Sequence, residues 1–337
     1  MPEIITDPVT GFQIPSSWIG SCSDPQALPK IQSGRWVLLS NGLLLKRGLT
    51  TGTTAAAACK GAVLSLAGSV DCLEVMTPVG IRVSLPVVGK EGFCIAVKDA
   101  GDHKFDVTHG LEIVAQARPS LETKLVAGPG VGRIVARGLC DEVGRPAISP
   151  SARQQIMKAI YEGLEETGLD HAHVELSLPR GLELAKETLN PRLGIMGGIS
   201  ILGSTGFVEP WNDHFISDRI QELKGAKRVV VTTGRTGLKF SRILFPDHKA
   251  VLMGSQLDRL AFETDQESIL CGLPALILKW AWPGVLEGTN YGTVAEMVEK
   301  EPQHKNIILA LERAKKKLPH TRIVLLYKDG RILREAP

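Results

Sequence analysis

Apolar and polar positions follow two different patterns along the chain. In the first half, apolar residues alternate with polar ones over three segments, which is typical of strands that bury one face of a sheet. These predicted strands are 73–75, 81–85 and 93–97. Two helical patterns accompany them: a run of small residues from Thr54, and an apolar stripe over 151–167 that ends at Gly168. Residues 46–200 are therefore predicted to form an α+β domain.

The second half contains short, continuously apolar runs separated by helical segments. Such runs are typical of parallel strands that are covered on both faces of a sheet. The predicted strands are 228–232, 249–254, 275–279 and 322–327. We expect a Rossmann-like three-layer α/β domain over 205–337, with the domain boundary in the glycine-rich stretch 194–206.

Residues 1–45 show no sustained period and contain five prolines. Prolines at this density favour an extended chain over helices or central strands. We therefore expect an extended lead-in that packs on the first domain.

Composition narrows the class of protein. The 337 residues carry Lys+Arg 39 against Asp+Glu 36, a net charge of +3, and only 5% are aromatic. A dedicated nucleic-acid binder would show a basic excess with interleaved aromatic residues, so no nucleic-acid partner is expected. Because no apolar run is long enough to span a bilayer and the six cysteines contain no Cys-x-x-Cys pair, we expect a cytoplasmic protein without disulfides or membrane contact.

A threonine-rich loop leads directly into the helix of small residues. Thr50, Thr51, Gly52 and Thr53 follow the basic Arg47. Backbone N–H groups at a helix N-terminus, together with hydroxyls and a flexible glycine, suit a carboxylate or phosphate. A simple helix cap needs one threonine, so we favour a ligand loop over a cap.

The segment 98–110 gathers three carboxylates, two lysines and two histidines between two predicted strands. Such clusters tend to hold perturbed pKa values. General acid–base work by His109, Asp99 or Asp102, or hydrogen bonding to a polar substrate, is the preferred interpretation. The spacing of Asp99, Asp102 and Asp106 does not match a calcium loop, and no bound metal is expected.

Three further segments are rich in glycine. Gly128–Arg133 allows close approach of a ligand to the backbone, with Arg133 as a carboxylate partner, although a tight turn with exposed arginines explains it equally well. The stretch 197–210 lies at the expected domain junction. The loop 232–237 follows the first strand of the α/β half, where open sheets bind ligands, but it lacks the Gly-x-Gly-x-x-Gly of nicotinamide-binding proteins.

Five of these segments, in this order, resemble the CbiD family of cobalt-precorrin-5B C(1)-methyltransferases. They are RGLTTGTTAAAACKGA, VKDAGDHKFDVTHG, GPGVGR, NPRLGIMGGISILGSTGFVEP and VVVTTGRTGLKF. The resemblance implies methyl transfer from S-adenosylmethionine to carbon 1 of a corrin precursor in the anaerobic route to cobalamin. It also implies an α+β domain joined to a Rossmann-like domain.

The residue roles that follow from this resemblance are expectations. The acetate and propionate arms of the corrin substrate would be bound by basic side chains and the threonine loop, namely Arg47, Thr50, Thr51, Gly52, Thr53, Lys98, Arg133 and Arg192. Asp99, Asp102 and His109 would lie near carbon 1 and assist proton movement. S-adenosylmethionine would be held by Ser204, Thr205, Gly206, Thr233, Gly234, Thr236 and Gly237.

Two alternatives stay open at this point. The α/β half permits a nicotinamide-dependent reductase of a corrin precursor, and a third possibility is a carrier that binds a corrinoid intermediate without altering it. A homo-oligomer, or transient contact with neighbouring enzymes of the pathway, is compatible with either.

Overall fold

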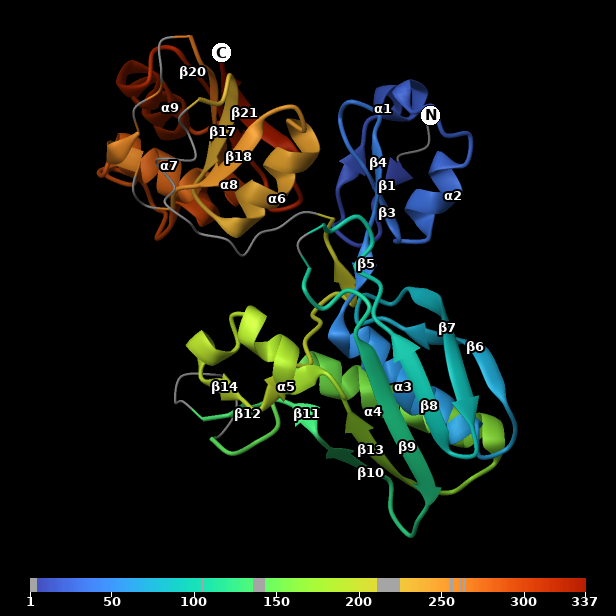
Figure 1. Ribbon diagram of the computed structural model, residues 1–337. Coiled ribbons are helices and arrows are strands. Elements are labelled where there is room, and N and C mark those ends of the chain that lie inside the picture. The colour runs from blue at the N-terminus through green and yellow to red at the C-terminus, as the bar shows by residue number, and fades with distance from the viewer. Residues whose placement is uncertain are drawn as a thin grey trace. The chain divides into compact units, whose positions relative to one another are not determined.

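The computed structural model (Figure 1) describes residues 5–104, 106–135, 143–210, 225–254, 257–260, 262 and 265–337, with the side chains of Arg192 and Arg259 left out. The chain divides into two compact units. Unit 1 comprises 1–28, 38–44 and 213–337, and unit 2 comprises 29–37 and 45–212. Both contain strands and helices, so the protein is of mixed α/β class. No helix in the described stretches has both the length and the apolarity to cross a membrane.

Unit 2 is built on a six-stranded sheet with the order β10-β13-β9-β8-β7-β6. Its strands are β6 (Val70–Met76), β7 (Arg82–Lys90), β8 (Phe93–Val97), β9 (Glu112–Pro119), β10 (Lys124–Ala127) and β13 (Ala172–Ser177). Neighbours are antiparallel except β10 and β13. Exposed and buried residues alternate strictly along β7, so one face of the sheet is covered. The three strands predicted from alternation are confirmed as β6, β7 and β8.

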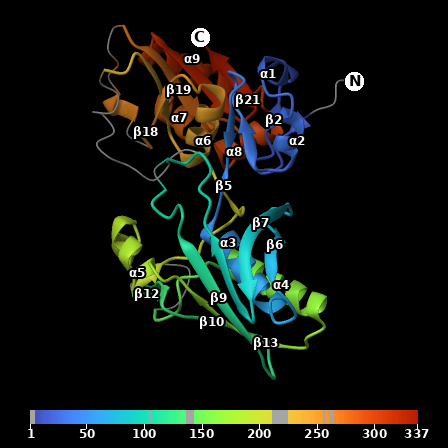
Figure 2. The same cartoon turned by 45° about the vertical axis from the view of Figure 1, so that its right-hand side comes forward.

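Two long helices, α3 (Thr51–Leu64) and α4 (Pro150–Thr167), lie on the covered face of this sheet (Figures 1 and 2). The four alanines 55–58 are completely buried, and their small side chains let α3 approach both the sheet and α4 closely. Helix α4 confirms the prediction from its apolar stripe, with Ser149 as N-cap and Gly168 as C-cap. Helix α3 begins three residues earlier than predicted because Thr50 caps it.

Short paired strands connect distant parts of unit 2. Strand β5 (Gly48–Leu49) pairs with β16 (Phe207–Val208), β11 (Gly130–Val131) with β15 (Gly198–Ile199), and β12 (Arg133–Ile134) with β14 (Ile195–Met196). The other short elements of unit 2 are α5 (Gly181–Leu184), η1 (Ala185–Glu187) and η2 (Pro191–Leu193). Three more, α2 (Ala27–Gln32), β3 (Trp36–Leu38) and β4 (Leu44–Lys46), have residues in both units. These pairings bring the glycine-rich segments of the sequence beside one another.

Unit 1 contains a five-stranded sheet with the order β18-β17-β19-β20-β21. Its strands are β17 (Arg228–Thr232), β18 (Lys249–Leu252), β19 (Glu267–Gly272), β20 (Thr321–Leu326) and β21 (Ile332–Ala336). All are parallel except β21 at the edge. The chain leaves β17 for β18 on one side and then returns to β19 on the other, so the strand order reverses between β17 and β19.

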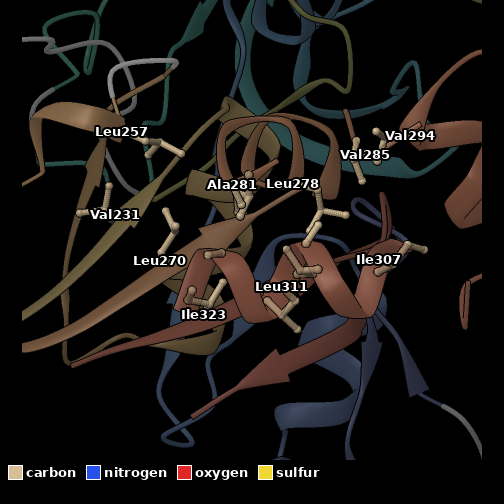
Figure 3. Packing of buried hydrophobic residues seen from close by; sticks show 14 of the residues in the cluster. Val231, Leu257, Leu270, Leu278, Ala281, Val285, Val294, Ile307, Leu311 and Ile323 are labelled. Atoms are coloured by element: carbon tan, nitrogen blue, oxygen red, sulfur yellow. The ribbon is translucent and has the colours of Figure 1, made fainter. Parts of the chain in front are cut away.

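Helices cover both faces of the unit 1 sheet. They are α6 (Arg235–Leu244), α7 (Pro274–Ala281), α8 (Val294–Lys300) and α9 (Lys305–Lys317), with a 3-10 turn, η4 (Leu257–Arg259). Figure 3 shows Leu278 of α7 and Leu311 of α9 packed with Leu270 and Ile323 of the strands. Residues of the opposite strand face, such as Val230, are also fully buried, which explains why these strands read as continuous apolar runs.

Residues 5–21 do not form the extended lead-in that was expected to pack on the first predicted domain. They form β1 (Ile5–Thr6), β2 (Gln13–Ile14) and α1 (Ser16–Ser21), and they belong to unit 1. The Phe12 ring lies 5.9 Å from that of Phe240 in α6, and the Ser40 N–H donates to the Ile243 carbonyl at 2.9 Å. Sequence periodicity could not reveal this, because contacts between the two ends of a chain leave no local pattern.

The predicted strand 275–279 is wrong, because these residues lie in helix α7. A run of four apolar residues, such as Ala275 to Leu278, fits a buried strand and a buried helix equally well. Pro274 at the first position of the helix is the signal that distinguishes them. The third parallel strand is instead β19, whose residues from 268 onward are all buried. The other predicted strands of this half correspond to β17, β18 and β20.

Candidate functional site

The loop between β8 and β9 is closed at its base by backbone hydrogen bonds. The Lys98 N–H donates to the Leu111 carbonyl, and the Gly110 N–H donates to the Lys98 carbonyl, each at 2.9 Å. The sheet strands on either side therefore fix both ends of the loop, and its polar residues project from a rigid base.

Asp99 anchors the loop to two basic side chains. Its Oδ2 lies 2.5 Å from Arg35 and 2.8 Å from the Lys46 ammonium, and its Oδ1 accepts the Gly101 N–H at 2.8 Å. Partial burial acts to raise the pKa of this carboxyl, but the Lys46 hydrogen bond, the Gly101 N–H and the Arg35 charge outweigh it and lower the pKa to about 2. A carboxylate so strongly held as an anion is a poor proton acceptor, which argues against the catalytic role predicted for Asp99.

Asp102 binds the same strand as Asp99. Its Oδ2 accepts the Lys46 N–H at 2.6 Å, and its own N–H donates to the Lys46 carbonyl at 2.9 Å. The side chain is exposed. Asp102 therefore ties the loop tip to β4, and the acid–base role predicted for it has no support from this arrangement.

Lys98 and Asp106 form an ion pair at the base of the loop. Their side chains are 3% and 14% exposed, and the ammonium lies 2.5 Å from Oδ2. The second carboxylate oxygen accepts the Thr108 N–H at 2.9 Å and the Thr108 hydroxyl at 2.5 Å. Burial acts to raise the pKa of Asp106, but the Lys98 charge and these hydrogen bonds lower it overall. Lys98 was predicted to bind substrate, but its buried ammonium group is paired with Asp106 instead.

Of the three residues predicted to be catalytic, His109 differs from Asp99 and Asp102 in that one polar atom of its side chain, Nε2, is left for a ligand. Its Nδ1 accepts the Ala100 N–H at 3.1 Å, across the loop, while the residue as a whole is exposed. The hydrogen bond fixes the orientation of the ring and occupies one of its two nitrogens. The second nitrogen, Nε2, can meet a ligand.

Arg47 is buried completely, contrary to the substrate-binding role predicted for it. Its Nε donates to Glu209 at 3.1 Å, and its Nη1 donates to the carbonyls of Gly34 and Trp36 at 3.2 Å each. These contacts join segments that are distant in the sequence. The charge of Arg47 therefore stabilises unit 2 and faces no solvent from which a substrate could approach.

The threonine loop is a helix cap, and its hydroxyls bond to the protein. Thr50 accepts the Thr53 N–H at 3.1 Å, and the Thr50 N–H donates to the Gly206 carbonyl at 3.1 Å. The Thr53 hydroxyl donates to the same carbonyl at 2.9 Å and accepts from Gln155 of α4 at 3.1 Å. The structure thus favours the helix cap over the ligand loop that the sequence suggested.

Thr51 and Gly52 are also occupied by protein contacts. The Thr51 hydroxyl accepts the Leu202 N–H at 2.9 Å, and the Gly52 N–H donates to the Leu202 carbonyl at 2.9 Å. A Cβ at Gly52 would lie 2.9 Å from both the Ala152 Cβ and the Leu202 oxygen. Both residues are buried, so the anion site predicted at this helix N-terminus is filled by the segment 200–206.

The segment 200–206 contains three residues predicted to bind the cofactor. Ser204 is exposed, and the half-buried Thr205 hydroxyl accepts the Phe207 N–H at 3.2 Å. Gly206 is buried with φ +89° and fits closely against Thr77. Of the three, Ser204 offers its side chain to solvent, whereas Gly206 serves the packing of unit 2.

The remaining basic candidates lie around the short ribbons of unit 2. Arg133 of β12 is exposed, and its Nη1 donates to the Gly144 carbonyl at 3.2 Å. Arg192 lies in η2, and its side chain is outside the described part of the structure. A Cβ at Gly130 would strike the Leu178 carbonyl, so this glycine permits the approach of protein backbone. That finding favours the turn interpretation of the Gly128–Arg133 segment.

The other predicted cofactor loop lies in unit 1, after β17. Thr233 and Gly237 are buried, and Thr236 and Gly234 are partly exposed. Gly234 is the N-cap of α6 and makes no side-chain cap hydrogen bond. The predicted cofactor residues thus divide between two units.

Sequence reasoning missed two residues that hold the 98–110 loop, Arg35 and Lys46. Both are distant in the sequence from the aspartate they bind, and neither belongs to a recognisable motif. Among the residues that the structure describes, no group of three or more His, Cys, Asp or Glu side chains is placed to hold a metal ion.

Known proteins resemble this chain over the part that contains the loops described above. The family model described as CbiD matches residues 39–210. Two relatives, from Methanococcoides burtonii and Methanosarcina acetivorans, are each 46% identical to the chain, cover 98% of it, are themselves covered to 98%, and bear the name cobalt-precorrin-5B C(1)-methyltransferase. A 1.9 Å crystal structure of a cobalamin biosynthesis protein (cbiD) from Archaeoglobus fulgidus is 36% identical, with a TM-score of 0.57 over 82% of this chain and 93% of that one. The chain belongs to the CbiD family.

Proposed function

We propose that this protein transfers a methyl group from S-adenosylmethionine to carbon 1 of cobalt-precorrin-5B and so forms cobalt-precorrin-6A in anaerobic cobalamin biosynthesis. The observation that carries this proposal is the 46% identity over 98% of both chains to relatives named for this methyl transfer. The five ordered segments of the sequence show where this likeness is concentrated.

Methyl transfer from a sulfonium demands alignment more than covalent assistance. The leaving group is already activated, so the protein has to orient the nucleophilic carbon, the methyl group and the sulfur, and to exclude water. The ion pairs of Asp99, Lys98 and Arg47 hold the loops of unit 2 in place, which is the kind of rigidity that such alignment requires. A rigid frame of this kind suits a reaction that depends on positioning.

The carboxyl ends of β17 and β19 suit S-adenosylmethionine. In a Rossmann-like arrangement, which we propose for unit 1, ligands bind where the strand order reverses. A Cβ at Gly237 would lie 3.0 Å from the Gly272 Cα, so the first turn of α6 lies against the end of β19. The N–H groups at 235–237 have no acceptor within the helix, and they would hold the carboxylate of the methionine moiety.

Exposed polar groups of unit 2 suit the carboxylate arms of the corrin substrate. His109, Lys104 and Arg133 are exposed, and the side chain of each can donate a hydrogen bond. We propose that they bind acetate and propionate arms in place of the buried Arg47 and the threonine loop.

The proposed reaction is tested by anaerobic incubation with cobalt-precorrin-5B and methyl-labelled S-adenosylmethionine. We expect the label at carbon 1 of the macrocycle. Reduction of the macrocycle by NADPH, with no label transferred, would instead identify a reductase. Binding of the macrocycle without label or reduction would identify a carrier.

Substitution of Gly234 tests the site for S-adenosylmethionine. A Cβ at Gly234 meets no atom within 4 Å, and its φ of −159° is accessible to any residue, so Gly234→Val should fold normally. The added side chain would lie at the start of α6, and we expect the affinity measured by calorimetry to fall about tenfold or more. Gly20→Ala in α1 is the matched control, since a Cβ there also meets no atom. Unchanged affinity in Gly234→Val would move the site elsewhere.

A further inference from the structure

The ring of His109 is fixed in one tautomer by a backbone donor. The Ala100 N–H donates to Nδ1 at 3.1 Å, so Nδ1 must carry a lone pair and no proton. In the neutral imidazole the proton then resides on Nε2. The exposed atom of this residue is therefore an N–H donor and has no lone pair with which to remove a proton.

The buried pair of Lys98 and Asp106 holds the turn that carries this ring. Asp106 bonds to Lys98 through one oxygen and to the N–H and hydroxyl of Thr108 through the other. The His109 N–H donates to the Asp106 carbonyl at 2.9 Å. Removing two charges from water costs free energy, and two apolar side chains in the same place would avoid that cost. Stability alone therefore does not explain this largely buried ion pair. It does fix the position of His109 relative to Ala100.

The charges around His109 favour an anion. The two charges of Lys98 and Asp106 cancel, and Asp99 faces two cations, Arg35 and Lys46. Lys104 and Asp102 of the same loop are both exposed and carry opposite charges. The loop 98–110 and its two basic partners thus carry four basic side chains against three acidic ones, a balance that favours an approaching carboxylate.

We propose that the buried Lys98–Asp106 pair is a positioning device that holds His109 as an Nε2–H donor to a carboxylate arm of the substrate. This inference rests on the proposed function for the identity of the arm, since the corrin precursor carries such carboxylates. It replaces the acid–base role predicted for His109 with recognition of an oxygen anion.

Nitrogen NMR of the whole protein labelled with 15N-histidine tests the positioning role. The His109 signals, assigned by their loss in His109→Gln, should report a single neutral Nε2–H tautomer. Lys98→Met should convert them to a mixture of tautomers, and Lys98→Arg should restore the single form. If Lys98→Met does not fold, Thr108→Val, which removes one hydroxyl from the same network, supplies the comparison. A mixture in the unsubstituted protein, or a single tautomer that persists in whichever of Lys98→Met and Thr108→Val folds, would overturn the proposal.

Kinetics separate this role from the proposed function. His109→Ala should raise the KM for the macrocycle about tenfold with little change in kcat, as expected for one lost hydrogen bond to a charged group. His109→Gln, which retains an N–H donor, should recover part of the loss. If the unsubstituted protein transfers no label, the proposed function fails while the NMR result stands. If it transfers label and His109→Ala leaves KM unchanged, the donor role fails.

Discussion

At the scale of single residues, Asp99 shows how charge holds a loop in place. Its folded pKa of about 2 lies below the ordinary 3.8, so the ionised form is the one that stabilises the fold. This contribution is fully present above about pH 4 and is lost as the pH falls toward 2. Since the side chain is 35% exposed, solvent screening reduces the contribution to about 1 kcal/mol.

We therefore expect Asp99→Asn to lower the free energy of unfolding by about 1 kcal/mol at pH 7. Urea unfolding across a pH series provides the measurement. The difference between Asp99→Asn and the unsubstituted protein should shrink below pH 4, because protonation of Asp99 removes the same ion pairs. A difference that stays constant down to pH 2.5 would mean that the charge of Asp99 is not its source.

Arg47 marks the limit of residue-level prediction. A basic residue beside a threonine loop is a reasonable candidate for binding an acidic substrate, and nothing local distinguishes it from a structural one. Its partners are Glu209 and two carbonyls at positions 34 and 36, which tertiary folding alone brings together. In contrast, the 98–110 loop was recognisable because its charged residues are dense and contiguous.

At the scale of elements, helix α3 depends on small residues more than on helix propensity. Gly52 lies in its first turn, where alanine would ordinarily be preferred. The alanine Cβ would however lie 2.9 Å from the Ala152 Cβ and the Leu202 oxygen. We expect Gly52→Ala to lower the free energy of unfolding by about 1–3 kcal/mol, because overpacking outweighs propensity.

Chemical denaturation followed by circular dichroism checks this expectation. The control is Gly20→Ala in α1, where the added methyl group meets no atom and should be neutral or slightly stabilising. Equal stability of Gly52→Ala and the unsubstituted protein would show that the segment 200–206 can shift away from α3.

Elements with a long or strictly alternating pattern were predictable from the sequence. Helix α4 and strands β6 to β8 have such patterns, since each buries one face and exposes the other. Helix α7 does not: a short apolar run such as 275–279 carries no period, and only its proline marks it as a helix. The contacts between Gly130 and Leu178, or between Thr51 and Leu202, depend on chain crossings that no window of the sequence contains.

At the scale of the whole molecule, unit 1 is assembled from both ends of the chain. Residues 1–28 and 38–44 join 213–337, and Phe12 is 4% exposed beside Phe240 of α6. Phe12 also lies 5.5 Å from Trp18. Helix α6, which packs on the C-terminal sheet, is therefore itself covered by residues from the N-terminal end of the chain, and we expect the stability of unit 1 to depend on them.

We expect Phe12→Ala to destabilise unit 1 by about 3–5 kcal/mol, the usual cost of removing a buried phenylalanine. Hydrogen exchange read by mass spectrometry should show faster exchange in β17, β19 and β20, with β7 to β9 of unit 2 unchanged. Leu121→Ala, at a residue that is 97% exposed in unit 2, should leave both units as they are. Faster exchange in the unit 2 strands of Phe12→Ala would show that the two units unfold together and that the division of the chain has no energetic meaning.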